Sequence, residues 1–301
     1  MKLPKRIILS RKGFDSKFGG FASPIFSDGR MTSLPIPENP NHRNVTVNFS
    51  GLGRPTDQDL SIASILKRLR PSFDLTRKVH LDPDIRPSLR PRNTKDPLGY
   101  FGQDGAPMKE LENTGVCEPD NHSLFLFYGW FKSVRVGYDG NLQYERARAN
   151  EQRSHHQHVI WGWLQSEGKP RRIPEEELTQ ELMQFGHHPH IEERYRGGNN
   201  CIFVSRKKLT FAGDVPGAGV FAHYEPILRL TCPNELGKRS SWLVPAFLHE
   251  SARGRIAKPQ WSSDGSNMRV QYTGFGQEFI FDIEGYEEAA ANWLERIFQC
   301  V

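Results

Sequence analysis

The chain has 301 residues, of which 37% are hydrophobic and 25% are charged, and its 19 Phe and 6 Trp can build an aromatic core, which argues against a disordered protein. No run approaches the roughly 18 apolar residues of a membrane span. The net charge of +5 is uneven, because residues 1–100 carry 18 Lys and Arg against 9 Asp and Glu, and the remaining residues carry 22 against 26. A basic N-terminal third is consistent with a nucleotide or nucleic acid as partner, and a solvated basic surface is the alternative.

The N-terminus lacks the apolar core of a secretory signal, and the four cysteines are scattered without CxxC spacing. We therefore expect a cytoplasmic protein with reduced thiols and no membrane partner. The sequence says nothing about oligomeric state.

The first predicted element is a buried strand over the apolar residues 6–10, followed by a basic, glycine-rich loop over 11–20. Such a loop can wrap an anion with its backbone N–H groups, and its candidate phosphate- or cofactor-binding residues are Arg11, Lys12 and Asp15. An ordinary structural loop is the alternative. Residues 31–37, with two prolines, predict an edge element.

A capping-box pattern beginning at Thr56 predicts a helix that runs to about Leu69. From Pro71 to Glu112 periodicity disappears, and this stretch predicts a long ordered loop. Buried strands are then expected at 123–131 and 158–165 with a shorter one at 134–136. A helix is expected to begin at Pro174 and to end at Gly186.

Further short strands are expected around 201–204, 221, 228–230, 242–244 and 276–282, and a closing amphipathic helix over 286–298. Together these elements predict one α+β domain over residues 1–301, with a basic N-terminal third (1–115) and a strand-rich core (116–301). Its centre is expected to be a mostly antiparallel β-sheet or barrel, with flanking helices and long ordered loops.

Seven of the eleven histidines lie in three short segments, at residues 80–84, 155–158 and 187–190. In an extended chain, positions i and i+2 face the same way, so imidazoles and carboxylates in these segments can point together. Mixed imidazole and carboxylate ligation suits non-haem iron, manganese or catalytic zinc. We predict a divalent metal, with iron preferred over manganese or zinc. The predicted ligands are His80, Asp82, His158, His188 and His190. The competing interpretation of each segment is a polar surface loop.

Three further carboxylates are candidate catalytic groups. Asp84 lies in the same segment as His80 and Asp82, where proline rigidifies the spacing. Glu278 and Asp282 are four residues apart in a predicted strand, so they share a face and either could act as a general base. A solvated strand end is the alternative for this pair.

Several stretches resemble the third of the nucleotide-modification-associated domain families. They are ILSRKGFD at 8–15, SPI at 23–25, HLDPD at 80–84, LFLFYGWF at 124–131, HVIWGWLQ at 158–165, HPH at 188–190 and GQEF at 276–279. The resemblance spans nearly the full chain and implies a link to base or nucleotide modification, without a defined reaction.

The middle of the chain is also similar to PUA-like barrels of the EVE or ASCH type, although Pro119 stands where such barrels have a glycine before Asp120. That resemblance implies that Trp130, Trp161 or Trp163 could stack on a flipped base. Two functions follow as hypotheses. The first is a metal-dependent enzyme acting on a nucleotide or nucleic-acid base. The second is a non-catalytic, PUA-like reader of modified nucleic acid.

Overall fold

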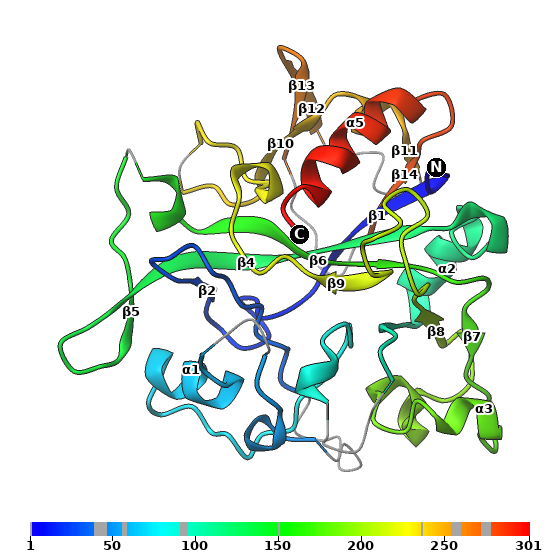
Figure 1. Ribbon diagram of the computed structural model, residues 1–301, viewed down its shortest axis with the longest axis horizontal. Helices are drawn as coiled ribbons and strands as arrows, with labels where there is room; N and C mark the ends of the chain where they lie inside the picture. The colour runs from blue at the N-terminus through cyan, green and yellow to red at the C-terminus, as the bar shows by residue number, and fades with distance from the viewer. Residues whose placement is uncertain are drawn as a thin grey trace.

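A computed structural model of the protein describes residues 2–38, 47–55, 59–90, 96–149, 151–235, 237–253, 260–271 and 278–301 (Figure 1). It is an α+β fold, as predicted, with one large mixed sheet and two three-stranded sheets. Over these residues, no helix combines the length and the apolar character that crossing a membrane requires.

The large sheet has the strand order β11-β14-β1-β4-β6-β9, and β2 and β5 also pair with β4. These strands are β1 (Arg6–Arg11), β2 (Ser23–Ile25), β4 (Leu124–Val136), β5 (Leu142–Tyr144), β6 (Gln157–Gln165), β9 (Ala218–Val220), β11 (Ala252–Arg253) and β14 (Glu278–Asp282). Strands β1 and β2 run parallel to β4, and the other pairs are antiparallel. The barrel alternative is wrong, because the end strands β9 and β11 each pair with one neighbour and do not meet.

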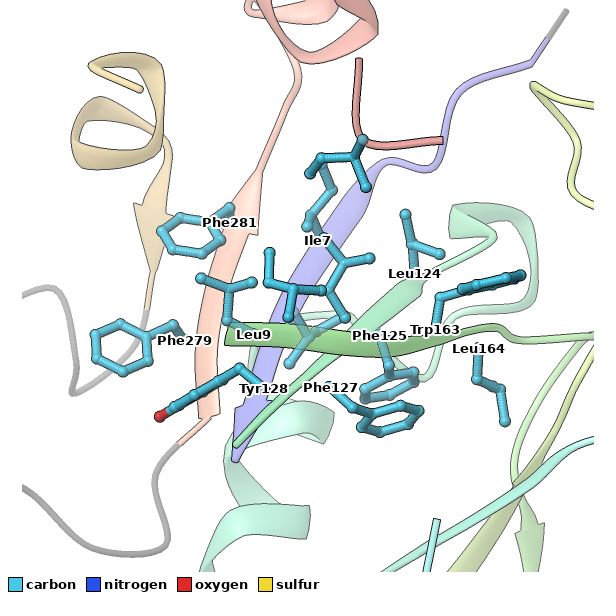
Figure 2. Packing of buried hydrophobic residues seen from close by; sticks show 14 of the residues in the cluster. Ile7, Leu9, Leu124, Phe125, Phe127, Tyr128, Trp163, Leu164, Phe279 and Phe281 are labelled. Carbon is cyan, nitrogen blue, oxygen red and sulfur yellow. The ribbon is translucent and has the colours of Figure 1, made fainter. Parts of the chain in front are cut away.

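The centre of the sheet carries side chains to both faces. Phe125 and Phe127 project to the same side of β4, where their rings stack 6.3 Å apart, whereas Trp163 of β6 lies on the opposite side (Figure 2). Alternation of this kind follows from the two-residue period of a strand. Because both faces are covered, these strands are apolar along almost their whole length.

Different elements cover the two faces. Helix α5 (Glu287–Phe298) contributes Phe298, whose ring lies 5.3 Å from that of Trp163. On the other face packs the small sheet of β3 (Tyr100–Gln103), β7 (Arg171–Arg172) and β8 (Cys201–Val204). Its Phe101 and Phe203 contact Phe125 at 4.9 and 4.8 Å. Figure 1 shows α5 on one side of the sheet, with β7, β8 and α3 (Gln180–Met183) on the other.

Two smaller hydrophobic clusters flank this core. One contains Phe14, Phe49 and Phe73 with the buried face of α1 (Ile62–Leu69), whose N-cap Ser61 accepts a hydrogen bond from the backbone N–H of Ser64. The other joins β3 and β8 to the segment before residue 192, through residues that include Tyr100, Phe185 and Ile191. The third sheet consists of β10 (Ser241–Pro245), β12 (Gln260–Asp264) and β13 (Asn267–Gln271), and α4 (Phe247–Glu250) lies between β10 and β12 in the chain.

Several predicted elements differ from the structure. The stretch 71–112 is not a continuous loop, because it contains β3 and α2 (Gly105–Asn113), whose Met108 and Leu111 are buried. The helix expected over 174–186 is reduced to α3. Residues 31–37 make only isolated bridges, and Leu228 ends a short 3-10 helix. Thr56, where we expected the first helix to begin, lies outside the described residues.

Candidate metal centre

Two of the predicted histidine segments meet in the interior. One potential ligand atom from each of His80, Asp82 and His190 lies within 4.8 Å of the other two, and all three side chains are buried. Within the described residues, no other group of three or more His, Cys, Asp or Glu side chains has this spacing. His80 and Asp82 follow Val79, which bridges to Pro37, and His190 lies in the 3-10 turn η5 (Pro189–Ile191).

Apolar neighbours anchor these ligands in separate clusters. Leu81, between His80 and Asp82, packs in the cluster around α1, and Ile191 packs in the cluster around β3 and β8. The backbone N–H of Asp82 donates to the carbonyl of His80 at 2.9 Å, so the chain makes a tight turn here instead of running extended. The two side chains therefore converge because of a turn, and not because of the strand periodicity that we assumed.

The ring of His80 has one nitrogen committed to an acidic partner. Its Nδ1 lies 2.9 Å from Oε2 of Glu38, and both side chains are buried. An ionised carboxylate only accepts, so Nδ1 carries the hydrogen and donates it. In the neutral ring Nε2 then has a free lone pair, and this is the arrangement in which a carboxylate orients a metal-binding histidine.

His190 is oriented in the same sense by an amide. Its Nδ1 lies 2.7 Å from Oδ1 of Asn200, whose Nδ2 donates to the carbonyls of His190 and Tyr195 at 2.8 and 2.6 Å. These two bonds fix the amide so that Oδ1 faces the ring, and the ring donates from Nδ1. Burial lowers the pKa of His190 to about 3, which keeps the imidazole neutral with its lone pair on Nε2.

Gly102 of β3 allows the ring of His190 to come this close. A Cβ atom at this position would lie 2.3 Å from Cγ and Cδ2 of His190. The backbone N–H of Gly102 also donates to Oδ1 of Asp82 at 2.7 Å. One residue without a side chain therefore supports two of the three potential ligands.

Asp82 is held as an anion. Its Oδ2 lies 3.1 Å from Nζ of Lys12, which also sits 4.5 Å from the centroid of the Phe101 ring. Burial raises the pKa of Asp82, but the Lys12 ammonium and the neighbouring histidines His188 and His190 outweigh this effect and hold it well below its usual range. Lys12, predicted to bind phosphate, is thus placed against a potential metal ligand.

His188 faces Asp82 with the ring nitrogen that carries its hydrogen. Its Nδ1 accepts a hydrogen bond from the backbone N–H of His190 at 3.2 Å, so the neutral ring carries its hydrogen on Nε2. That nitrogen is buried and lies 3.3 Å from Oδ1 of Asp82, without the alignment of a hydrogen bond. Burial lowers the pKa of His188. His188 therefore lies against Asp82 but is not one of the three side chains whose ligand atoms converge.

Glu278 begins β14 and is paired in register with Ser10 of β1. Its Oε1 accepts from Nε2 of Gln103 at 2.7 Å, whereas its buried Oε2 makes no hydrogen bond within the described part of the chain. Burial raises the pKa of Glu278 against the opposing effect of the Lys12 ammonium. A carboxyl group in this state can hold a proton at higher pH than an exposed glutamate does.

The other two predicted catalytic carboxylates are engaged elsewhere. Asp84 forms a fully buried ion pair with Arg90 at 2.7 Å, and Nε2 of His187 lies 2.6 Å from it. Asp282 pairs with Arg6 at 2.6 Å, at the end of β14 opposite to Glu278. A four-residue separation along a strand corresponds to about 13 Å, so the structure does not bring Glu278 and Asp282 to one site.

Two of the predicted phosphate-binding residues pair with each other. Arg11 forms an ion pair with Asp15, and Oδ1 of Asp15 accepts from the backbone N–H groups of Lys17 and Phe18 at 2.7 Å. Asp15 therefore shapes the glycine-rich loop, which agrees with the structural-loop alternative for these two positions.

His158 lies in another pocket. Its Nδ1 accepts from Nε1 of Trp242 at 3.0 Å, and its ring packs edge-on against those of Tyr128 and Trp242. Burial, with the nearby cations Arg239 and Arg11, lowers its pKa well below the usual range. The structure thus gives His158 the contacts of a core histidine. Trp161 and Trp163 are likewise buried, and only Trp130 of the three proposed stacking residues is partly exposed.

Sequence reasoning missed the residues that orient the potential ligands. Glu38 is 42 residues from His80, and no spacing pattern connects the two. Asn200 is 10 residues from His190, in a stretch read as a loop. The only local signal at Glu38 was an acidic residue between Pro37 and Pro40, and it is not specific.

The fold and this site define a class of protein: an α+β protein with a buried group of two histidines and one aspartate that a divalent ion could occupy. The family model for nucleotide modification associated domain 3 matches residues 6–282. The chain belongs to this family and is thereby associated with nucleotide modification. Searches of curated proteins and of solved structures give no match.

Proposed function

We propose that this protein is a metal-dependent enzyme that modifies a nucleotide or a nucleic-acid base, with His80, Asp82 and His190 as the metal ligands. The observation that carries the proposal is the buried convergence of these three side chains, with ligand atoms within 4.8 Å of one another. Family membership supports the part of the proposal that concerns a nucleotide, and the buried group of ligand atoms supports the part that concerns a metal.

Two histidines and one carboxylate are the ligand set of non-haem Fe(II) oxygenases, in which the remaining coordination positions stay open. We therefore propose iron, with manganese or zinc as the alternatives. The residues fit such an ion, because Glu38 and Asn200 each direct a lone pair of the neighbouring imidazole away from themselves and Asp82 is kept anionic. A bound ion would activate water or oxygen, or would orient the substrate.

The chain itself supplies proton handling and charge. Lys12 keeps Asp82 ionised and brings a positive charge to the edge of the site. Glu278, with its raised pKa and its unpartnered Oε2, can give or take a proton at a substrate atom. Gln103, which holds the other oxygen of Glu278, fixes the carboxyl plane.

The test is metal analysis of protein purified without a histidine tag and reconstituted without oxygen with Fe(II), Mn(II) or Zn(II). We expect near-stoichiometric metal in the wild type and its loss in His80→Ala and His190→Ala. The matched control is His155→Ala, because the ring of His155 contacts only the backbone carbonyl of Arg148 among the bonds described. Circular dichroism establishes that each variant is folded.

Wild-type protein that stays metal-free under all three conditions would contradict the proposal. If that metal-free protein still bound oligonucleotides carrying a modified base, the second hypothesis, a non-catalytic reader, would take its place. A reader would then need a pocket other than a PUA-like barrel, because the sheet is open.

A further inference from the structure

A cleft of about 690 Å³ lies beside the small sheet β3-β8-β7. Its wall is formed by the segment that leaves β8, by the start of β7 and by the end of α3, elements that lie together on one side of the molecule (Figure 1). Apolar side chains of Leu98, Phe185, Val204 and Leu209 line part of it. Of the residues that line the cleft, Leu98 lies in the N-terminal third of the chain, and the others lie between residues 167 and 210.

Four cations line this cleft: Arg171, Arg206, Lys207 and Lys208. Arg206 pairs with Glu167 at 3.1 Å, and Arg171 pairs with Glu181 at 3.2 Å. In the part of the chain that the structure describes, no carboxylate forms an ion pair with the two exposed lysines. The cleft therefore carries a net positive charge, and its lysines are available to an anion.

The pairing of the strands explains why the charges gather. Arg171 and Arg172 of β7 lie opposite Ile202 and Cys201 of β8, so the chain that leaves β8 carries residues 206–208 along the same edge. Arg171 and the basic residues 206–208, which come from distant stretches of the chain, thereby line one surface. Cations spread over a surface in this way match a series of phosphates better than the single phosphate end of a free nucleotide.

The cleft is also close to the candidate metal centre. Leu98 lines the cleft, and Gly102, four residues later, bonds to Asp82. A chain spans at most about 3.6 Å per residue, so these two Cα atoms are no more than about 14 Å apart. Between them, Tyr100 packs against Phe185 of the cleft at 4.8 Å. Both rings are buried, so the cleft and the candidate centre lie on either side of one hydrophobic layer.

We infer that this cleft binds the phosphate backbone of a single-stranded nucleic acid whose target base is modified at the candidate metal centre. The single strand follows from the burial of the site, because a base stacked in a duplex cannot reach an interior atom without being extruded. The apolar lining then contacts sugars and base faces while the lysines contact phosphates. The inference rests on the proposed function for the identity of the target base, but the binding itself does not require the metal.

The experiment measures fluorescence anisotropy of a short labelled single-stranded oligonucleotide across a series of salt concentrations, with the full chain both as purified and after reconstitution with metal. The variant is Lys207→Ala with Lys208→Ala. The matched control is Lys109→Ala with Arg135→Ala, which removes the same charge from exposed positions outside the cleft lining. Loss of two phosphate contacts should lower the slope of log K against log salt by about 1.4 and weaken binding roughly tenfold at physiological salt.

A cleft variant that binds with the wild-type affinity and slope would overturn the inference, and so would equal weakening in the control. Tighter binding to a duplex than to the single strand would also overturn it. Metal content, measured in parallel, keeps the two proposals apart. A metal-free wild type whose oligonucleotide binding depends on Lys207 and Lys208 rejects the metal centre and retains the cleft. Metal-loaded protein whose oligonucleotide binding does not depend on Lys207 and Lys208 retains the metal centre and rejects the cleft.

Discussion

Two buried regions of this protein contain histidines, and they differ in the hydrogen-bond partner of the ring nitrogen Nδ1. At the candidate metal centre, His80 and His190 each donate from Nδ1 to an oxygen, so the lone pair of the neutral ring is directed into the group. In the other region, Nδ1 of His158 accepts from the Trp242 indole, and the ring packs among aromatic side chains. Burial is common to both regions. The hydrogen-bond partner, and not the burial, separates a potential ligand from a core histidine.

The substitution with the largest expected effect on this difference between the two regions is Asp82→Asn. This change removes the anionic ligand and leaves the Lys12 ammonium without its carboxylate. We expect metal affinity to fall more than 100-fold, and the free energy of unfolding to fall by about 3 kcal/mol, since a charge loses its partner. Chelator competition and urea denaturation measure the two effects.

The control for that prediction is Asp84→Asn, two residues away. Asp84→Asn removes the charged partner of the fully buried Arg90, so it should destabilise the fold at least as much as Asp82→Asn. It should nevertheless leave metal affinity unchanged. Equal loss of metal in both variants would mean that the metal responds to general stability and not to ligation by Asp82.

A smaller effect is expected when a partner of a ligand is changed. Asn200→Ala removes the acceptor that fixes the His190 tautomer, and Glu38→Gln weakens the acceptor at His80. Loss of such an outer partner lowers metal affinity by about 10- to 100-fold. Competition with a chelator of known affinity measures it, and wild-type affinity in both variants would contradict the role given to the second ring nitrogen.

The complementary change in the other region is His158→Phe. It leaves the buried Nε1–H of Trp242 without its acceptor, which lowers the free energy of unfolding by about 1–3 kcal/mol. Metal content should stay at the wild-type level. If this variant folded but lost its metal, His158 would be a ligand after all, and the distinction drawn between the two regions would fail.

The smallest effect concerns pH and Glu278. Its pKa in the folded state is raised by burial, so its contribution to stability is present below the unfolded value and is lost as pH rises through the folded value. In Glu278→Gln this loss is absent. The stability of the apoprotein should therefore fall less between pH 4.5 and neutral pH than in the wild type, as urea midpoints at several pH values will measure. A parallel pH profile in the two proteins would remove Glu278 as a proton-holding group.

Much of the fold followed from local sequence patterns. The apolar run that became β6 and the amphipathic pattern of α5 were predicted nearly to their ends, because strand and helix periodicity are local properties. Strand β4 joins two strands that were predicted separately, over 123–131 and 134–136. Helix α2 was missed because only Met108 and Leu111 of its residues are buried, and this leaves little periodic signal. Strand β3 was missed because it has only four residues, of which Gly102 and Gln103 give no apolar signal.

The candidate centre was foreseen in its residue types but not in its geometry. The HLDPD and HPH segments supplied His80, Asp82 and His190, which the structure brings together. The group of converging ligand atoms does not include His158 or His188, and the partner of each ring comes from tertiary contacts that spacing does not encode. The basic cleft was also out of reach, since its charges come from two stretches that only the pairing of β7 and β8 joins.

The candidate centre draws its ligands and their partners from residues 12 to 200 and from hydrophobic clusters that pack separately. A nascent chain that has not yet passed Asn200 has no complete site, so an ion bound here would not guide early folding. Once captured at 100 times its dissociation constant, it would add about 2.7 kcal/mol to the stability of the folded state. Metal supply would then set the lifetime of the protein against proteolysis as well as its activity.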